Sequence, residues 1–305
     1  MIEELVFQEE YFNEEEREGF LIESMMKRAW AAQIVVLREI DRICRRHGIQ
    51  YFADWGTLLG AARHKGFIPW DDDMDIAMKR RDYKRFLKIA EEELPEGYRL
   101  HTAGKAGYPN MFARVVNSSE ISFDKERMET FYGCPYVVGI DIFPLDIIPR
   151  DEEEEELQAQ IMMILWGALK QLREGSEELE ATLSKLHEFL NVEIDRSGDV
   201  LEQLLVLADR ISQLYGEADG DEYTLTEHFF VHRDFRLKKE WYESTVDMVF
   251  ENILIPVPVG YQEVLDKMYG EWRTFVKNSA SHDYPFYKNQ KQMVEDYLAS
   301  HRNGK

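Results

Sequence analysis

The sequence lacks the features that mark secreted, membrane-spanning and disulfide-stabilised proteins. Only Cys44 and Cys134 are cysteines among 305 residues, too few for a disulfide framework, so we expect two reduced, buried thiols. The longest apolar runs, such as 161–169, fall far short of the about 20 residues that cross a bilayer. Glutamates at the start replace the basic and apolar segments of a secretory signal, so we expect a soluble, cytoplasmic protein.

Basic residues are also scarce. The chain has 37 lysines and arginines against 59 aspartates and glutamates, which gives a formal net charge of −22. This charge repels the phosphate backbone, so we expect no nucleic-acid partner. A protein of this charge that handles phosphorylated ligands needs divalent cations, or arginine and lysine placed at the site.

No internal repeat and no linker rich in proline, glycine or serine divides the chain. Strand patterns cluster in the first half and helical patterns in the second, which predicts an α+β protein with a small mixed sheet and a helical addition. We expect an acidic leader over residues 1–19, the core over 20–150, and a mainly helical region with a late hairpin over 151–305, packed on the core.

Local patterns predict the elements of this fold. Apolar residues recur at helical spacing over 20–47, and Gly48 supplies the C-terminal stop. A helix capped by Asp82 follows the second strand, and we expect the basic run at 79–85 to face solvent. The remaining expected elements are strands at 49–55, 76–78, 98–102, 111–117, 121–123 and 137–148, helices at 56–64, 82–94 and 261–269, helical patterns up to residue 215, and a hairpin over 245–257.

An acidic cluster at 71–75 is the most informative feature of the sequence. It places four aspartates within five residues, although like charges this close raise one another's pKa, so something must offset the repulsion. On a strand, the side chains of Asp73 and Asp75 point to the same side. Two carboxylates on one face are a natural site for a hard divalent cation such as Mg²⁺ or Mn²⁺.

The cluster allows two other interpretations. A solvated acidic loop is the simpler one, but Trp70 before the cluster and Ile76 after it place the aspartates at the mouth of something buried. A calcium-binding EF-hand loop would begin at Asp71, which puts Ile76 where a glycine is required and Asp82 where a bidentate glutamate belongs. The EF-hand interpretation therefore fails.

A third carboxylate would complete a metal-dependent phosphoryl-transfer site. Asp141 is the best candidate, because it lies between Ile140 and Ile142 in a strand-like run, where an aspartate without a partner is costly to bury. Asp146 comes second, since it follows Pro144 and an aspartate satisfied at a turn explains it as well.

A glycine and a threonine stand at the expected strand-to-helix junction before the acidic cluster. Gly56 lets the backbone approach a phosphate, the amides that follow point toward it, and the Thr57 hydroxyl adds a hydrogen bond. A tight turn without a ligand is the commoner explanation of such a pair. The pattern is not a Walker P-loop, because no Gly-Lys-Ser/Thr follows.

Together these residues resemble a known family. The run at 56–76, with its Arg-His-Lys-Gly-Phe-Ile-Pro-Trp-Asp-Asp-Asp-Met-Asp-Ile core, is similar to the signature of the LicD family, the phosphorylcholine transferases of bacterial cell-surface glycans, which are related to fukutin and fukutin-related protein. Gly-Ile-Asp-Ile-Phe-Pro-Leu-Asp at 139–146 resembles the family's second motif, and 111–118 resembles a weaker third one. Late in the chain, a further set of residues resembles the C-terminal pattern of the LicD family: Pro258, Tyr261, Leu265, Tyr269, Gly270, Glu271, Trp272 and His282.

The resemblance implies a nucleotidyltransferase-like fold and a metal-dependent transfer reaction. A phospho-alcohol, phosphocholine first of all, would move from a CDP-linked donor such as CDP-choline to a hydroxyl of a cell-surface glycan, with release of CMP. Asp73, Asp75 and Asp141 would be catalytic and hold Mg²⁺ (or Mn²⁺). Asp71 would help directly or through water, and Asp141 would accept the proton of the hydroxyl. The expected donor-binding residues are Gly56, Thr57, Arg63, His64, Lys65 and Arg114.

Two other functions fit the same residues. A nucleotidyltransferase attacks the α-phosphorus of a nucleoside triphosphate and releases pyrophosphate, whereas an inactive relative would bind metal or nucleotide as a regulatory module. The second is disfavoured because all three candidate ligands are present. The donor alcohol is open between choline, ribitol, glycerol and ethanolamine. Family members act on lipid-linked glycan precursors, which implies peripheral contact with the inner face of the membrane.

Overall fold

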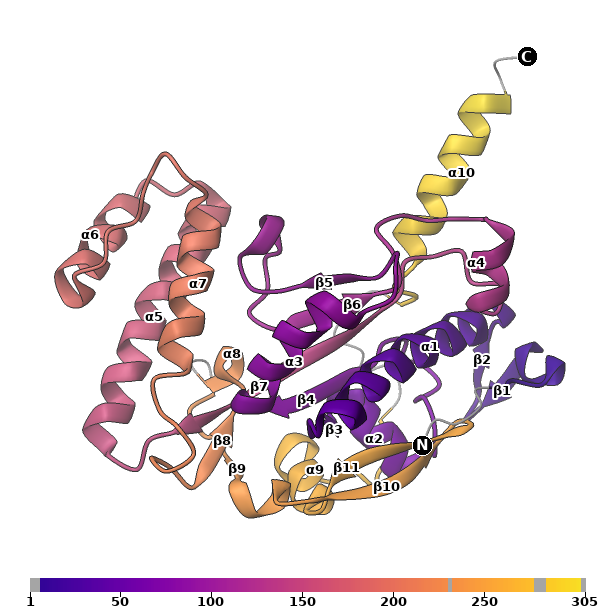
Figure 1. Ribbon diagram of the computed structural model, residues 1–305, viewed down its shortest axis with the longest axis horizontal. Helices are drawn as coiled ribbons and strands as arrows, with labels where there is room; N and C mark the ends of the chain where they lie inside the picture. Colours follow the sequence, from indigo (N-terminus) through magenta and orange to yellow (C-terminus); the bar gives the residue numbers. More distant parts are fainter. Residues whose placement is uncertain (1–5, 230–231, 277–283, 303–305) are drawn as a thin grey trace.

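A computed structural model of the chain describes residues 6–229, 232–276 and 284–302 (Figure 1). Its helices are α1 (Ser24–His47), α2 (Trp55–Arg63), α3 (Arg80–Glu93), α4 (Lys125–Thr130), α5 (Glu152–Glu174), α6 (Leu179–Leu190), α7 (Val200–Ser212), α8 (Thr226–Phe229), α9 (Tyr261–Tyr269) and α10 (Lys288–Arg302), with short 3₁₀ helices η1 (Glu9–Phe12), η2 (Lys105–Gly107) and η3 (Lys239–Tyr242). The strands are β1 (Glu15–Arg17), β2 (Phe20–Ile22), β3 (Phe52–Ala53), β4 (Asp75–Lys79), β5 (Arg99–His101), β6 (Ala113–Val116), β7 (Gly139–Ile148), β8 (Glu222–Thr224), β9 (Leu237–Lys238), β10 (Thr245–Phe250) and β11 (Ile253–Pro258).

A mixed sheet forms the centre of the described part of the chain, with the strand order β3-β4-β7-β6-β5 and with β8 and β9 added beside β7. β4 and β7 run parallel, whereas β3 pairs with β4, and β6 with β7, in antiparallel directions. The parallel pair sets Asp75 opposite Asp141 and Ile76 opposite Ile142. Because successive side chains of a strand point to opposite faces, the two aspartates share one face of the sheet and the two isoleucines share the other. The predicted α+β class, a small mixed sheet flanked by helices, is confirmed.

Helices α1 and α3 pack against this sheet, where α1 contacts β7 and α3 contacts both β4 and β7. Trp30, Ile34 and Leu37 recur at helical spacing along α1 and are fully buried. Gly48 ends α1 as predicted, because its φ of 60° is left-handed and its N–H donates to the carbonyl groups of Cys44 and Arg45. The apolar face of α1 therefore determines how the helix lies on the sheet.

Helices α5, α6 and α7 lie together to one side of the sheet (Figure 1) and share an apolar cluster of their own. The Asp151 carboxylate caps α5, since it accepts hydrogen bonds from the N–H groups of Glu153 at 2.9 Å and Glu154 at 3.1 Å. The run of glutamates that follows fills the first turn of α5, where negative side chains interact favourably with the helix dipole. The acidic run at 151–156 is thus a helix start.

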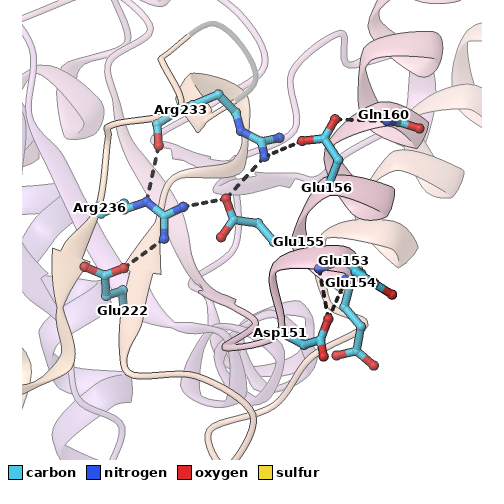
Figure 2. Close-up of polar contacts among 9 residues, drawn as sticks. All are labelled: Asp151, Glu153, Glu154, Glu155, Glu156, Gln160, Glu222, Arg233 and Arg236. Carbon is cyan, nitrogen blue, oxygen red and sulfur yellow. Dashed lines mark hydrogen bonds and ion pairs between the residues drawn. The ribbon is translucent and has the colours of Figure 1, made fainter.

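Two arginines join α5 to the strands beside β7 (Figure 2). Arg236 donates to Glu155 of α5 and, at 2.9 Å, to Glu222 of β8. Arg233 donates to Glu155 at 3.2 Å and to Glu156 at 3.0 Å. Because Glu155 is buried, this network fixes the helical addition against β8 and β9.

The hairpin expected at 245–257 is present as β10 and β11. At its turn, the Glu251 carboxylate accepts hydrogen bonds from Arg17 at 3.0 Å and from the N–H of Phe67 at 3.1 Å. A Cβ at Gly66 would lie 2.2 Å from the same carboxylate, so only glycine leaves room for it. The hairpin thereby joins the acidic leader to the loop that follows α2.

The structure corrects three local predictions. Residues 20–22 do not begin the long helix, because they pair with β1 as β2. Asp82 does not cap α3, which begins after Lys79; its carboxylate instead accepts a hydrogen bond from the N–H of Gln50 at 3.2 Å. Residues 121–123 are irregular and lead into α4 instead of forming a strand. Strand pairing overrides the local pattern at residues 20–22, and a contact distant in the sequence overrides it at Asp82. Residues 121–123 have no strand partner among the described residues.

Among the described residues, no helix combines the length and apolar character that crossing a membrane requires. Cys44 and Cys134 are buried and free, as expected, and burial raises the pKa of the Cys134 thiol to about 11.

We expect Gly60 to be essential for the packing of α2. A Cβ at this position would lie 2.4 Å from the carbonyl oxygen of Gly66, so Gly60→Ala forces the backbone to move and should lower the free energy of unfolding by about 1–3 kcal/mol. The matched control is Gly167→Ala in α5, where nothing lies within 4 Å of the added Cβ and alanine should stabilise the helix by up to about 1 kcal/mol. Equilibrium urea denaturation measures both variants. Equal effects would contradict the packing argument.

Candidate functional site

The acidic loop at 71–73 is held from behind by α1. Trp30 Nε1 donates to the carbonyl oxygen of Asp71 at 3.1 Å, and Gln33 Nε2 donates to the carbonyl oxygen of Asp72 at 2.7 Å. Both donors are buried, so the helical core determines where the loop lies. Each of the three loop aspartates offers a carboxylate oxygen within 4.8 Å of the other two.

Asp75 begins β4 directly after this loop, beside Asp141 of β7. The N–H of Asp141 donates to the carbonyl oxygen of Met74 at 3.1 Å, and the N–H of Asp75 donates to the Thr57 hydroxyl oxygen at 2.8 Å. The sheet therefore brings together carboxylates that are 66 positions apart in the sequence. The pKa of Asp75 is raised well above its usual value, first by burial and then by the negative charges of Asp73, Asp141, Asp71 and Asp54.

Arg114 of β6 is the cross-strand partner of Asp141 of β7. Strand β6 pairs with the edge of β7 that faces away from β4. The Arg114 guanidinium donates through Nη2 to one carboxylate oxygen of Asp141 at 2.5 Å, and through Nε to the other. Burial lowers the pKa of Arg114, but the hydrogen bonds and the charge of Asp141 outweigh it and hold the pKa above its ordinary value. Arg114 thus supplies fixed positive charge within the acidic cluster; its contact with a donor phosphate stays a prediction.

Asp54 is a further carboxylate of this cluster, and sequence reasoning missed it. Its N–H donates to the carbonyl oxygen of Asp75 at 3.0 Å, and its side chain is buried. Asp54 Oδ2 has no hydrogen-bond partner among the residues that the structure describes. Burial raises the pKa of Asp54 to about 7. In the sequence, Asp54 stands directly before α2, where an aspartate is usually explained as the N-cap of the helix. In the structure its side chain makes no capping hydrogen bond.

Asp72 was also missed, and it connects the acidic loop to the C-terminal segment. Its carboxylate is fully buried and accepts a hydrogen bond from the N–H of Phe286 at 2.5 Å. The Gln290 side chain bonds both the N–H and the carbonyl oxygen of Val137, at 2.9 and 3.0 Å. The start of α10 is thus attached to the core next to the acidic loop, while the rest of the helix extends away from the body (Figure 1).

Gly56 and Thr57 lie against the carboxylates. A Cβ at Gly56 would lie 2.2 Å from Oδ2 of Asp71, so the close approach that requires glycine is made by that carboxylate. Thr57 is buried, and its hydroxyl oxygen accepts the hydrogen bond from Asp75 described above. The pair therefore positions two of the predicted metal ligands, and phosphate binding by it stays a prediction.

The basic residues after α2 are engaged in different ways. Arg63 donates to the carbonyl oxygen of Trp272 at 2.8 Å, so its guanidinium binds the segment after α9. The His64 ring packs edge-on against Phe275, and burial, followed by the charge of Arg63, lowers its pKa to about 4, which leaves it neutral at pH 7. Lys65 is exposed. Donor binding by these three residues stays a prediction.

Asp146, the second candidate for a third metal ligand, forms an internal ion pair. Its two oxygens accept hydrogen bonds from Arg80 at 2.6 and 2.7 Å, and the Thr226 hydroxyl donates to it at 2.6 Å. Arg80 also donates to Asp209 of α7 at 2.7 Å. The expectation that the whole basic run at 79–85 faces solvent is therefore wrong at Arg80, which is largely buried between the core and the helical addition.

The site fits a divalent cation. Its carboxylate oxygens come from the loop, β4, β7 and the start of α2, and oxygen ligands are those that Mg²⁺ and Mn²⁺ prefer. After burial, the negative charges of Asp73, Asp141, Asp71 and Asp54 raise the pKa of Asp75. A cation bound among these oxygens would offset this charge, and it would also attract an anionic diphosphate.

Residues 48–153 match the family model described as LicD/FKTN/FKRP, nucleotidyltransferase domain. We call this stretch the LicD-type domain, after the family model that it matches. The chain is 28% identical over 252 residues to the lipopolysaccharide cholinephosphotransferase LicD of Haemophilus influenzae, which covers 79% of this chain and 89% of that protein. It is 42% identical over 50 residues to the human ribitol 5-phosphate transferase FKRP, which covers 15% of this chain and 10% of that protein.

These findings confirm the resemblance to LicD proteins and the prediction of a LicD-like phosphotransferase. The LicD-type domain contains every carboxylate of the cluster described above. From the C-terminal pattern, Tyr269 ends α9, and the segment that follows it accepts a hydrogen bond from Arg63. His282 of the same pattern lies outside the described residues.

We expect Asp54 to make stability depend on pH. Its folded pKa of about 7 lies above its ordinary value of 3.8, so between these values the folded state keeps a proton that the unfolded state has released. Its contribution is therefore fully present below about pH 4, is lost as pH rises to about 7, and is constant above. In the wild type with EDTA present to remove metal, the free energy of unfolding should fall by the order of 4 kcal/mol over this pH range, because each unit of pKa difference is worth about 1.4 kcal/mol. Asp54→Asn should abolish this decline.

Urea denaturation at several values between pH 4 and 8 measures this decline. The control is Asp247→Asn, which changes an exposed aspartate on β10 and should keep the wild-type profile. If Asp54→Asn declines with pH as steeply as the wild type, Asp54 is not the group responsible.

Proposed function

We propose that the protein is a metal-dependent phosphotransferase that moves phosphocholine from CDP-choline to a hydroxyl of a cell-surface glycan and releases CMP. The observation that carries the proposal is the juxtaposition of Asp75 and Asp141 beside the acidic loop, within a LicD-type domain. The choice of choline is supported by the similarity to the cholinephosphotransferase over 79% of the chain. Acceptors of this kind are lipid-linked, so we also propose work at the inner face of the membrane.

Asp71, Asp73, Asp75 and Asp141 would hold Mg²⁺ or Mn²⁺. The bound cation supplies charge neutralisation at the donor phosphate oxygens and a lower pKa for a coordinated hydroxyl. The chain's own residues keep three of these four aspartates in place. Thr57 bonds the backbone of Asp75, Trp30 bonds that of Asp71, and Arg114 holds the Asp141 side chain. Such pre-organisation favours a transition state in which charge develops on phosphate oxygens.

The contacts of Asp141 bear on the proton of the attacking hydroxyl, which the family resemblance assigns to this residue. Both oxygens of Asp141 accept hydrogen bonds from Arg114, which stabilises the ionised form and makes that carboxylate a weak base. Loss of the proton would therefore depend mainly on the lower pKa of a hydroxyl that the cation coordinates.

Arg114 is the residue that we expect to contact the donor diphosphate from the protein side. Its guanidinium group already binds Asp141 within the acidic cluster. A guanidinium can donate two parallel hydrogen bonds to phosphate oxygens, as it does to a carboxylate. Arg63 is less suited to this role, because it donates to the backbone of residue 272.

The reaction products test the proposal against nucleotidyl transfer. With Mg²⁺, CDP-choline and a glycan acceptor, we expect CMP release and transfer of a label from choline phosphate to the acceptor. CTP should give no pyrophosphate. Pyrophosphate release from CTP would favour nucleotidyl transfer, and failure to release CMP from CDP derivatives of choline, ribitol, glycerol and ethanolamine would contradict the proposal.

Substitution of the predicted ligands tests the metal site. Asp73→Asn and Asp75→Asn should each lower Mg²⁺-dependent CMP release at least about 100-fold, because a metal ion contributes several kcal/mol of transition-state stabilisation. Calorimetric titration with Mn²⁺ should show weakened binding in the same variants. The exposed Asp247→Asn should match the wild type in both measurements. Wild-type activity and Mn²⁺ affinity in Asp73→Asn would refute the metal assignment.

A further inference from the structure

An aromatic wall adjoins the carboxylates. We use this name for the side chains of Trp55, Phe112, Phe143 and Phe235, all of which are partly buried. The ring centroid of Phe143 lies 4.6 Å from that of Phe112 and 6.4 Å from that of Trp55. Trp55 in turn stacks on Phe235, with centroids 5.8 Å apart and an interplanar angle of 12°. The four rings form one continuous set of contacts, although they come from four separate segments.

The wall lies on the same face of the sheet as the predicted metal ligands. Phe143 is two residues beyond Asp141 on β7, so its side chain points to the same face, about 7 Å farther along the strand. Phe112 comes directly before β6, and Trp55 directly before Gly56. A ligand whose phosphate lies among the carboxylates therefore has these rings within reach of a short substituent.

The backbone at Trp55 is strained. Its φ is 42°, in the left-handed region that a bulky side chain avoids. Strain of this kind costs of order 1–3 kcal/mol, and it persists where the surrounding structure imposes it, most often at functional sites. Here it places the indole against Phe143, His228 and Phe235.

The chemistry of the wall favours a cation that needs few hydrogen bonds, because its single polar atom is Trp55 Nε1, which is buried and has no partner among the described residues. His228 contacts Trp55 and Phe235, and burial lowers its pKa, so it is neutral at pH 7 and does not repel positive charge. The phenylalanine rings offer π faces without hydrogen-bonding groups. A polyol such as ribitol, in contrast, needs a partner for each hydroxyl that it buries. The acidic cluster next to the wall further favours a positively charged group.

We propose that the aromatic wall binds the trimethylammonium group of the donor's choline, and so determines which phospho-alcohol the enzyme transfers. The inference rests on the proposed function, since it takes CDP-choline as the donor. It adds to that function the residues that select choline. The short ethylene link of choline phosphate matches the neighbouring positions of the wall and the carboxylates on one sheet face.

The test removes one ring at a time and keeps the apolar volume. Phe143→Leu and, at a separate place in the wall, Phe235→Leu are compared with Phe189→Leu, which changes an exposed phenylalanine on α6. Calorimetry with Mg²⁺ measures the affinities for CDP-choline, CDP-ribitol and CMP. We expect CDP-choline to bind about tenfold more weakly to both wall variants, as the loss of one cation–π contact implies. The affinity for CMP should change less than twofold, and Phe189→Leu should match the wild type.

Each other outcome overturns the inference or locates the failure elsewhere. If the wall variants lose affinity for CMP and for CDP-choline equally, the cytosine ring binds to the aromatic wall, and choline selection is refuted. Unchanged CDP-choline affinity in both variants, or a wild type that binds CDP-ribitol more tightly than CDP-choline, would refute choline selection. Because binding is measured without turnover, a wild type that releases no CMP but shows the expected tenfold difference would refute the proposed reaction and keep the wall. Circular dichroism confirms folding, and the two variants at separate positions keep the test decisive should one of them fail to fold.

Discussion

The parallel pairing of β4 with β7 is the constraint on which the site depends. It sets Asp75 beside Asp141 next to the acidic loop, an arrangement that costs free energy because the negative charges repel one another. The neighbouring structure offsets part of this cost. Arg114 neutralises one carboxylate, and hydrogen bonds from α1 and α2 hold the backbone that carries the others. A divalent cation, as proposed, would offset the remainder.

Some of this arrangement could be predicted from the sequence, and the reason is local. An aspartate between isoleucines, as at Asp141, signals a carboxylate that is buried for a purpose, and the Asp-x-Asp spacing before a strand signals its partner. Local pattern also predicted two long elements. Helix α1 was predicted from the helical spacing of its apolar residues, and β7 from a run of apolar residues. The partners of Asp146 could not be predicted. Arg80 lies 66 residues away from it in the sequence, and only the fold brings the two together. Asp54 was hidden because its position has an ordinary explanation as a helix cap.

The family match covers residues 48–153, but the surroundings of the site extend beyond it. Phe235 stacks on Trp55, and the segment after α9 accepts hydrogen bonds from Arg63. Phe286 bonds the carboxylate of Asp72. The predicted metal ligands thus lie in the LicD-type domain, whereas part of the structure around them, such as Phe235 of the aromatic wall, comes from later in the chain. Relatives that share the domain and differ elsewhere can therefore keep these carboxylates and differ in what surrounds them.

The attachment of residues 284–290 has a consequence for how the protein is made. The carboxylate of Asp72 meets its backbone partner only after Phe286, 214 positions later in the chain, has left the ribosome. Until then the acidic loop lacks one of its hydrogen bonds. Helix α1 and strands β3 to β7 can assemble early, because they lie in the first 148 residues. The acidic loop should accordingly gain this contact late in synthesis, after the strands that carry Asp75 and Asp141 have already paired.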